Sequence, residues 1–77
     1  MNKYAVDVFR SDAVTIVVEA ENEDEAIVIA GETAWNISRH EWSSCDDYEI
    51  DVYDELSDLI ELGYKVEYRD GVGFLTA

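Results

Sequence analysis

The sequence contains one cysteine, one histidine and no proline, and the first two shortages exclude several kinds of site. Because Cys45 has no second cysteine in the chain, an intramolecular disulfide is impossible. A zinc site built from the cysteine and histidine side chains of one chain is also excluded, since only Cys45 and His40 are present. We therefore expect a reduced protein that carries no cofactor and no metal.

Long apolar runs are absent as well. Asp7 interrupts the apolar start of the chain, which is unlike the uninterrupted core of a secretory signal. No stretch approaches the roughly 20 apolar residues that cross a bilayer. These features predict a cytoplasmic protein with no membrane partner.

Positive charge is scarce, because 5 Lys and Arg residues face 19 Asp and Glu residues and leave a net charge of −14. Such a chain repels nucleic acid and anionic membranes, and it attracts the basic grooves of other proteins. With 48% hydrophobic and 12% aromatic residues, it is too apolar for an acidic disordered tail. A length of 77 residues allows one acidic domain, residues 1–77.

The two ends of the chain show the alternation of apolar and polar residues that is typical of strands. Residues 4–9 and 14–18 predict two strands joined as a hairpin, and residues 64–69 and 72–75 predict two more around Asp70-Gly71. Asn22 precedes three acidic residues and predicts the start of a helix that runs to about residue 38.

The middle of the chain fits two periodicities. Tyr48, Val52, Leu56 and Leu59 follow helical spacing up to Gly63, which favours one helix over about residues 45–62. The alternative is a short strand over residues 48–53 followed by a short helix from Asp54. We prefer the single helix because it explains more apolar positions. The predicted fold is α+β, a small antiparallel sheet of three to four strands with two helices on one face, in the order strand-strand-helix-helix-strand-strand.

An uncompensated acidic row is the main candidate for a binding site. Between Glu41 and Leu62 there are nine acidic residues and no Lys or Arg. Spacings of 4, 3, 4 and 3 would place five of them on one face of a helix, where like charges repel: Asp47, Asp51, Asp54, Asp58 and Glu61. Such a row spans roughly 21 Å and can imitate part of one DNA strand, which carries a charge about every 3.4 Å.

Further acids can extend this surface. Glu55 flanks the row, and an acidic cluster over residues 19–25 offers Glu21, Asp24 and Glu25 as a second contact with the partner. The simpler interpretation of that cluster is that acids favour the start of a helix.

Other chemistries receive little support. A calcium loop counted from Asp46 places Asp51, not glycine, at its sixth position. Cys45 and His40 come without any sign of a substrate pocket, so an enzyme is not expected. Trp35 and Trp42 are best explained by core packing, although either can anchor a partner.

The acidic row, together with the opening YAVDVF and VTIVVEAENEDEAI, resembles the small acidic anti-CRISPR proteins encoded by phages, in particular a type I-C anti-CRISPR of the DNA-mimic kind. The resemblance implies a non-enzymatic inhibitor that fills the positively charged DNA path of a CRISPR surveillance complex in the bacterial host cytoplasm. Restriction enzymes, repair proteins and nucleoid proteins have similar basic grooves and remain possible targets. The alternative function is a small interaction or regulatory module that binds through an aromatic or hydrophobic surface, with the acidity serving solubility.

Overall fold

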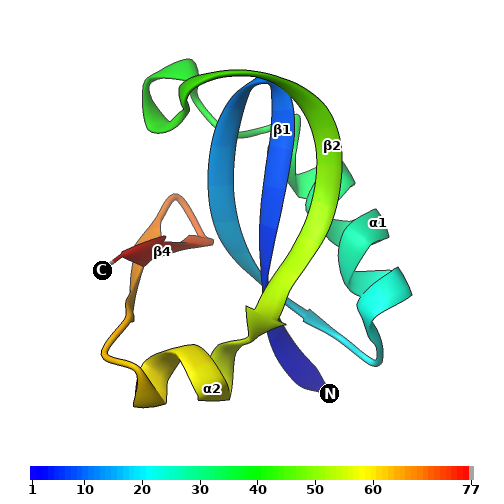
Figure 1. Ribbon diagram of the computed structural model, residues 1–77, viewed down its shortest axis with the longest axis vertical. Helices are drawn as coiled ribbons and strands as arrows, with labels where there is room; N and C mark the ends of the chain where they lie inside the picture. Colours follow the sequence, from blue (N-terminus) through cyan, green and yellow to red (C-terminus); the bar gives the residue numbers. More distant parts are fainter. Residues whose placement is uncertain (77) are drawn as a thin grey trace.

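The protein is built around one long strand, β1 (Asn2–Ala20), which lies inside a four-stranded antiparallel sheet of order β2-β1-β4-β3 (Figure 1). A computed structural model describes residues 1–76. Along the chain, β1 is followed by α1 (Glu23–Ala34), the short 3-10 helix η1 (Arg39–Glu41), β2 (Ser43–Glu55), α2 (Leu56–Glu61), β3 (Lys65–Arg69) and β4 (Val72–Thr76). Strands account for 55% of the structure and helices for 28%, so the fold is dominated by its sheet.

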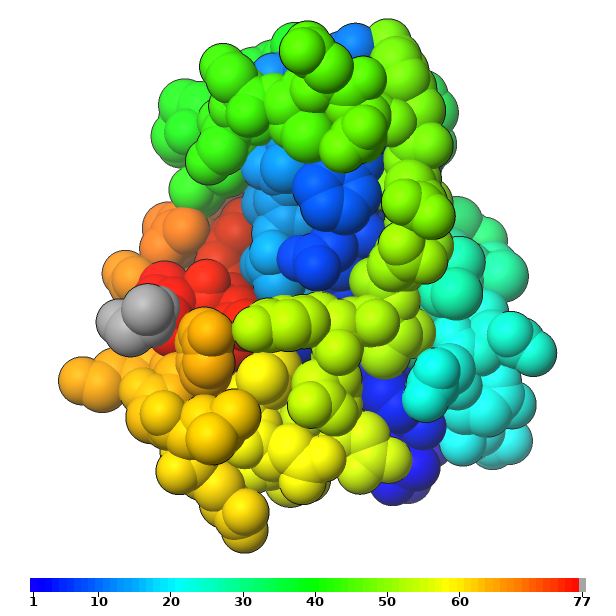
Figure 2. All heavy atoms as spheres, in the orientation of Figure 1, coloured from blue at the N-terminus to red at the C-terminus, as the bar shows by residue number. Residues whose placement is uncertain are grey.

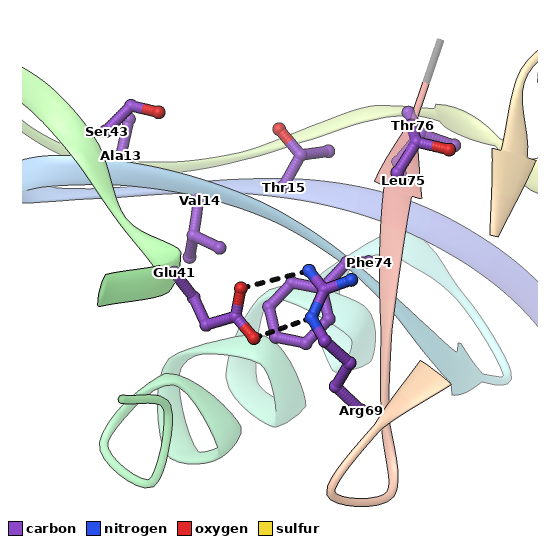
Figure 3. Close-up of a pocket in the computed structure, with 9 residues that line it drawn as sticks. All are labelled: Ala13, Val14, Thr15, Glu41, Ser43, Arg69, Phe74, Leu75 and Thr76. Atoms are coloured by element: carbon purple, nitrogen blue, oxygen red, sulfur yellow. Dashed lines mark hydrogen bonds and ion pairs between the residues drawn. The ribbon is translucent and has the colours of Figure 1, made fainter. Parts of the chain in front are cut away.

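The first strand doubles back on itself. Ser11 has a positive φ of 63°, and the two halves of β1 run side by side on either side of it (Figures 1 and 3). Thr15 Oγ1 donates a hydrogen bond to Asp7 Oδ1 across the two halves, at 2.5 Å. The first half and the start of the second half pair with β2, up to Ala13, and Ile16 and Val17 of the second half pair with β4. The two strands predicted at residues 4–9 and 14–18 are therefore the two halves of this element.

One face of the sheet forms the main core under α1. Val6, Val8 and Ile16 are fully buried there, and the helix contributes a stripe of small buried residues, Ala26, Ala30 and Ala34. Small side chains allow the helix to approach the sheet closely. The helix begins as predicted, because the Asn22 side chain accepts a hydrogen bond from the backbone of Glu25 at 2.9 Å. It ends at Ala34, four residues before the predicted end.

The single long helix predicted over residues 45–62 is wrong. Residues 43–55 form β2, which pairs with the first half of β1, and Ile50 and Val52 pack against the main core. A helix in this position would leave the hydrogen-bonding groups of that half of β1 without partners, which the strand supplies. The pairing of β2 with β1 therefore selects the strand period over the helical period. This pairing joins segments that are distant in the sequence, so it cannot be obtained from the local pattern of residues.

The predicted arrangement of two helices on one face is wrong for the same reason. Only the last part of the predicted helix is helical, and it forms α2, which lies at the foot of the sheet while α1 runs along its side (Figure 1). Leu59 of α2 is 1% exposed, but it does not belong to the buried cluster that α1 covers. The observed order is strand, helix, strand, helix, strand, strand. No helix within residues 1–76 has the length and apolar character needed to cross a membrane.

The β3–β4 hairpin agrees with the sequence. Asp70 and Gly71 both have positive φ, 52° and 80°, which is the geometry of a type I′ turn. This turn has the twist that matches the two flanking strands, and it places Arg69 directly beside Val72 in the register.

Replacing Gly71 tests this turn. We expect Gly71→Val to lower the free energy of unfolding by about 1–2 kcal/mol, because a β-branched residue resists the left-handed conformation. Urea unfolding followed by tryptophan fluorescence measures the change. The control is Asp70→Asn, which we expect to change the stability by less than about 0.5 kcal/mol because Asn tolerates positive φ. Equal stabilities of Gly71→Val and the natural protein would contradict the turn.

Candidate partner-binding surface

The structure divides the predicted acidic row between two elements. Asp47, Asp51 and Asp54, with the flanking Glu55, lie on β2, while Asp58 and Glu61 lie on α2. Successive side chains of a strand point to opposite faces, so a spacing of four keeps Asp47 and Asp51 on one face but a spacing of three does not. The irregularity between the pairs Ala5–Asp54 and Val6–Val52 adds one residue to β2, however, so Asp54 lies opposite Ala5 and returns to the face of Asp51. Asp58 and Glu61 belong to α2 and do not continue this strand. The continuous five-residue row is therefore absent.

A different row takes its place. Asp47, Glu49 and Asp51 alternate along β2 and point away from the face that holds Ile50 and Val52. We call these three residues the β2 carboxylate row. All three are exposed, and alternate residues of a strand lie about 6.6–6.8 Å apart. Figure 2 shows atoms of β2, in yellow-green, at the surface along much of one side of the molecule.

Glu49 is absent from the predicted row because the helical period passes over it. The signal that marks it is the alternation of acids at residues 47, 49 and 51 around Tyr48 and Ile50. The same alternation brings in Asp7 of β1, whose backbone lies directly opposite Asp51 in the register. Like charges in opposite positions of a sheet repel each other, and the Thr15 hydroxyl that bonds to Asp7 compensates part of this repulsion.

The row is electrostatically strained. The pKa of Glu49 is raised, first by the negative charge of Asp51, then by a hydrogen bond shared with Asp51, and to a smaller extent by burial and by Asp47. Within residues 1–76, the ion pairs involve other acids: Arg39 pairs with Asp12, Arg69 pairs with Glu41 and Glu67, and His40 lies near Glu41. The fold therefore supplies the row with no cation from the described part of the chain.

The second acidic cluster has a structural role at the start of α1. Glu25 Oε1 accepts a hydrogen bond from the backbone of Glu21 at 3.2 Å, and the backbone of Glu25 bonds to the Asn22 side chain. This is the reciprocal arrangement of a capping box, shifted by one residue. Glu21 and Asp24 are exposed, and no hydrogen bond or ion pair in the described chain links them to the β2 carboxylate row.

Trp35 is not in the core, so its predicted packing is wrong. Its side chain is 76% exposed, and the Arg10 guanidinium lies over its ring at 4.2 Å from the centroid. Arg10 is held in place by donating to the Gly31 carbonyl at 2.7 Å. Trp42, in contrast, is partly buried against the main core, as predicted.

These side chains border a surface groove of about 520 Å³, which we call the aromatic groove. It lies at the end of α1, whose last residue, Ala34, is part of its lining. Its lining consists of Arg10, Ala34, Trp35, Ile37, Arg39, Trp42 and Tyr48. Aromatic and arginine side chains of this kind are common at the energetic centres of protein interfaces.

A second hollow, of about 270 Å³, is closed by an internal ion pair (Figure 3). Arg69 donates from Nε and Nη2 to the two carboxylate oxygens of Glu41, at 2.7 and 3.0 Å, and its guanidinium lies 4.4 Å from the Phe74 ring centroid. The hydrogen bonds from Arg69 lower the pKa of Glu41, and those same bonds raise the pKa of Arg69. The charges and hydrogen-bonding groups of Glu41 and Arg69 are thus paired with each other rather than free for a ligand. We call this ion pair, which links η1 to β3, the Glu41–Arg69 clasp.

Residues 1–76 contain neither a cluster of metal ligands nor a hydrogen-bonded Cys–His pair. Among residues 1–76, no three His, Cys, Asp or Glu side chains are placed to hold a metal ion. Cys45 donates to Asp47 Oδ2 at 3.6 Å, while the exposed His40 lies 4.0 Å from Glu41. No hydrogen bond in this part of the chain pairs Cys45 with His40.

The Glu41–Arg69 clasp predicts a specific dependence of stability on pH. A carboxyl whose folded pKa is lowered stabilises the fold above its unfolded pKa of about 4.3, and this contribution is lost as the pH falls through the folded value. We expect Glu41→Gln to unfold at lower urea concentration than the natural protein at pH 7, and the difference to shrink below pH 4. Urea midpoints across this range measure it. A constant difference at all pH values would contradict the clasp.

Comparison of the chain with the profiles of known protein families, with curated protein sequences and with solved structures found no match.

Proposed function

We propose that the protein is a non-enzymatic inhibitor that occupies the basic nucleic-acid-binding surface of another protein and competes there with DNA. The β2 carboxylate row is the part of its surface that makes the central contact. The observation that carries this proposal is the alignment of three exposed acids on one strand face without a cation from the described chain.

The energetics of the row favour an external cation. Asp51 and Asp47 raise the pKa of Glu49, so the folded protein bears a repulsion that it does not relieve internally. Arg and Lys side chains of a partner would relieve it through charge-assisted hydrogen bonds. Docking thus gains the attraction of the new pairs and removes the repulsion within the row.

The spacing of the row is compatible with imitation of DNA. Its residues recur about every 6.6–6.8 Å along the strand axis, roughly twice the 3.4 Å axial spacing of charges on one DNA strand. Exposed acids elsewhere on β2 raise the density of charge along the strand, namely Asp46, Asp54 and Glu55. Asp58 and Glu61 continue the acidic surface onto α2, and Glu21 and Asp24 remain a proposed second contact.

The resemblance to type I-C anti-CRISPR proteins favours a CRISPR surveillance complex as the target. A net charge of −14 would also speed the encounter with any cationic cleft, and salt would screen this effect.

The test is displacement of labelled target DNA from a purified type I-C surveillance complex. We expect the natural protein to displace the DNA, and Glu49→Lys with Asp51→Lys to need at least about tenfold more protein, because two attractive pairs become repulsive. Raising the ionic strength should slow association steeply.

The matched control is Glu19→Lys with Glu32→Lys, which makes the same change in net charge at two exposed positions outside β2 and α2. We expect it to lose much less activity than the reversal on β2. Equal losses in both variants would show that net charge alone acts, and would contradict a site on β2. Failure of the natural protein to displace DNA would exclude this target.

The aromatic groove supports a second candidate function, an interaction module that binds through its aromatic side chains. The exposed Trp35 stacked by Arg10 is the observation that favours it. Under this function Trp35→Ala weakens partner binding at least about tenfold, as for an interface hot spot. Titration calorimetry at low and high salt then gives similar affinities, whereas the reversal on β2 has little effect. Strong salt dependence with no effect of Trp35→Ala would rule this function out.

A further inference from the structure

The strand that carries the carboxylate row is also an edge of the sheet. In the order β2-β1-β4-β3, β2 has β1 on one side only. Within residues 1–76, the backbone of β2 hydrogen-bonds to β1, and its only other hydrogen bond joins the Glu55 amide to the Asp54 side chain. Every second residue of an antiparallel strand directs its N–H and C=O away from its partner. The outer side of β2 therefore presents free hydrogen-bonding groups.

The middle of β2 is regular enough to accept another strand. Irregularities in the β1–β2 register lie between Ala5 and Val6 and between Arg10 and Asp12. Between them, residues 48–52 pair without interruption with residues 6–10. Bulges are a common protection of sheet edges, and here they lie outside residues 48–52, whose pairing is regular.

The two faces of the same segment differ in chemistry. Glu49 and Asp51 stand on the acidic face, while Tyr48 stands on the other face, where it is 75% exposed and borders the aromatic groove. A strand laid beside β2 would have its own side chains alternate in the same way. Its basic residues would meet the carboxylate row, and its apolar residues would lie beside Tyr48.

The acidic side chains of β2 determine which kind of strand can pair with its free edge. Acids on an edge strand protect it against pairing with another copy of itself, since like charges in opposite positions repel. The same acids attract a strand with Lys or Arg in those positions. A second copy of this chain is thus disfavoured at the edge, and a basic extended segment is favoured.

We propose that an extended segment of the partner, with alternating basic and apolar residues, adds to residues 48–52 as a further antiparallel or parallel strand. This inference rests on the proposed function, because the β2 carboxylate row is the contact in both. It adds that main-chain hydrogen bonds, and not charge alone, hold the partner.

The test uses a peptide of about eight residues, a common length for a strand, in which Lys and Val alternate. Two further versions carry N-methyl groups on alternate amides, one on the odd positions and one on the even positions. All three have the same charge, but strand addition uses only one of the two sets of amides. Fluorescence anisotropy of the labelled peptides, titrated with the full-length protein, gives the affinities.

We expect the unmodified peptide and one methylated version to bind with similar affinity. The other methylated version should bind at least about tenfold more weakly, because it loses two or more hydrogen bonds to β2. Binding of the unmodified peptide should also weaken with Glu49→Gln and Asp51→Asn in the protein. Equal binding of both methylated peptides would overturn strand addition, as would absence of binding by all three. Neither result touches the proposed function, which displacement of DNA tests independently.

Discussion

The pairing of β2 with the first half of β1 is the interaction on which the rest of the structure depends. It draws an acidic segment of the chain into the sheet, where Ile50 and Val52 pack against the core and Glu49 and Asp51 face solvent. It also places Tyr48 beside the end of α1, where Tyr48, Ala34 and Trp35 line the aromatic groove. The carboxylate row and the aromatic groove are both results of this one pairing, on opposite faces of the same strand.

The sequence predicts those parts of the fold that depend on neighbouring residues. The helix start at Asn22, the turn at Asp70-Gly71 and the alternation in both halves of β1 each have a local physical cause, and the structure contains all three. The middle of the chain has no such local cause. Tyr48 and Val52 belong to a strand and Leu56 and Leu59 to a helix, yet their combined spacing fits a single helix. Strand preference depends on the neighbouring strand, and that neighbour is about forty residues away in the sequence.

The candidate site was predictable in composition but not in geometry. The excess of acids between Glu41 and Leu62 is visible in the sequence, and Asp47 and Asp51 belong both to the predicted row and to the observed one. Glu49 enters because the period of the side chains in a strand is two rather than 3.6, and Asp58 and Glu61 leave because they belong to a separate helix, α2. Trp35 illustrates the same limit. Its exposure follows from where α1 ends and from the position of Arg10, and neither can be obtained from the spacing of apolar residues.

The two carboxyl groups with shifted pKa values show how the fold tolerates the row. Glu41 has a lowered pKa because of Arg69, so its charged form stabilises the folded state at neutral pH. Glu49 has a raised pKa, so its contribution has the opposite sign, and stability is lost as the pH rises through that value. Arg69 is thus used between η1 and β3, and no ion pair within residues 1–76 involves an acid of the row. Because the repulsion in the row persists in the folded protein, a cation from a partner gains more there than it would at an acid that is already paired.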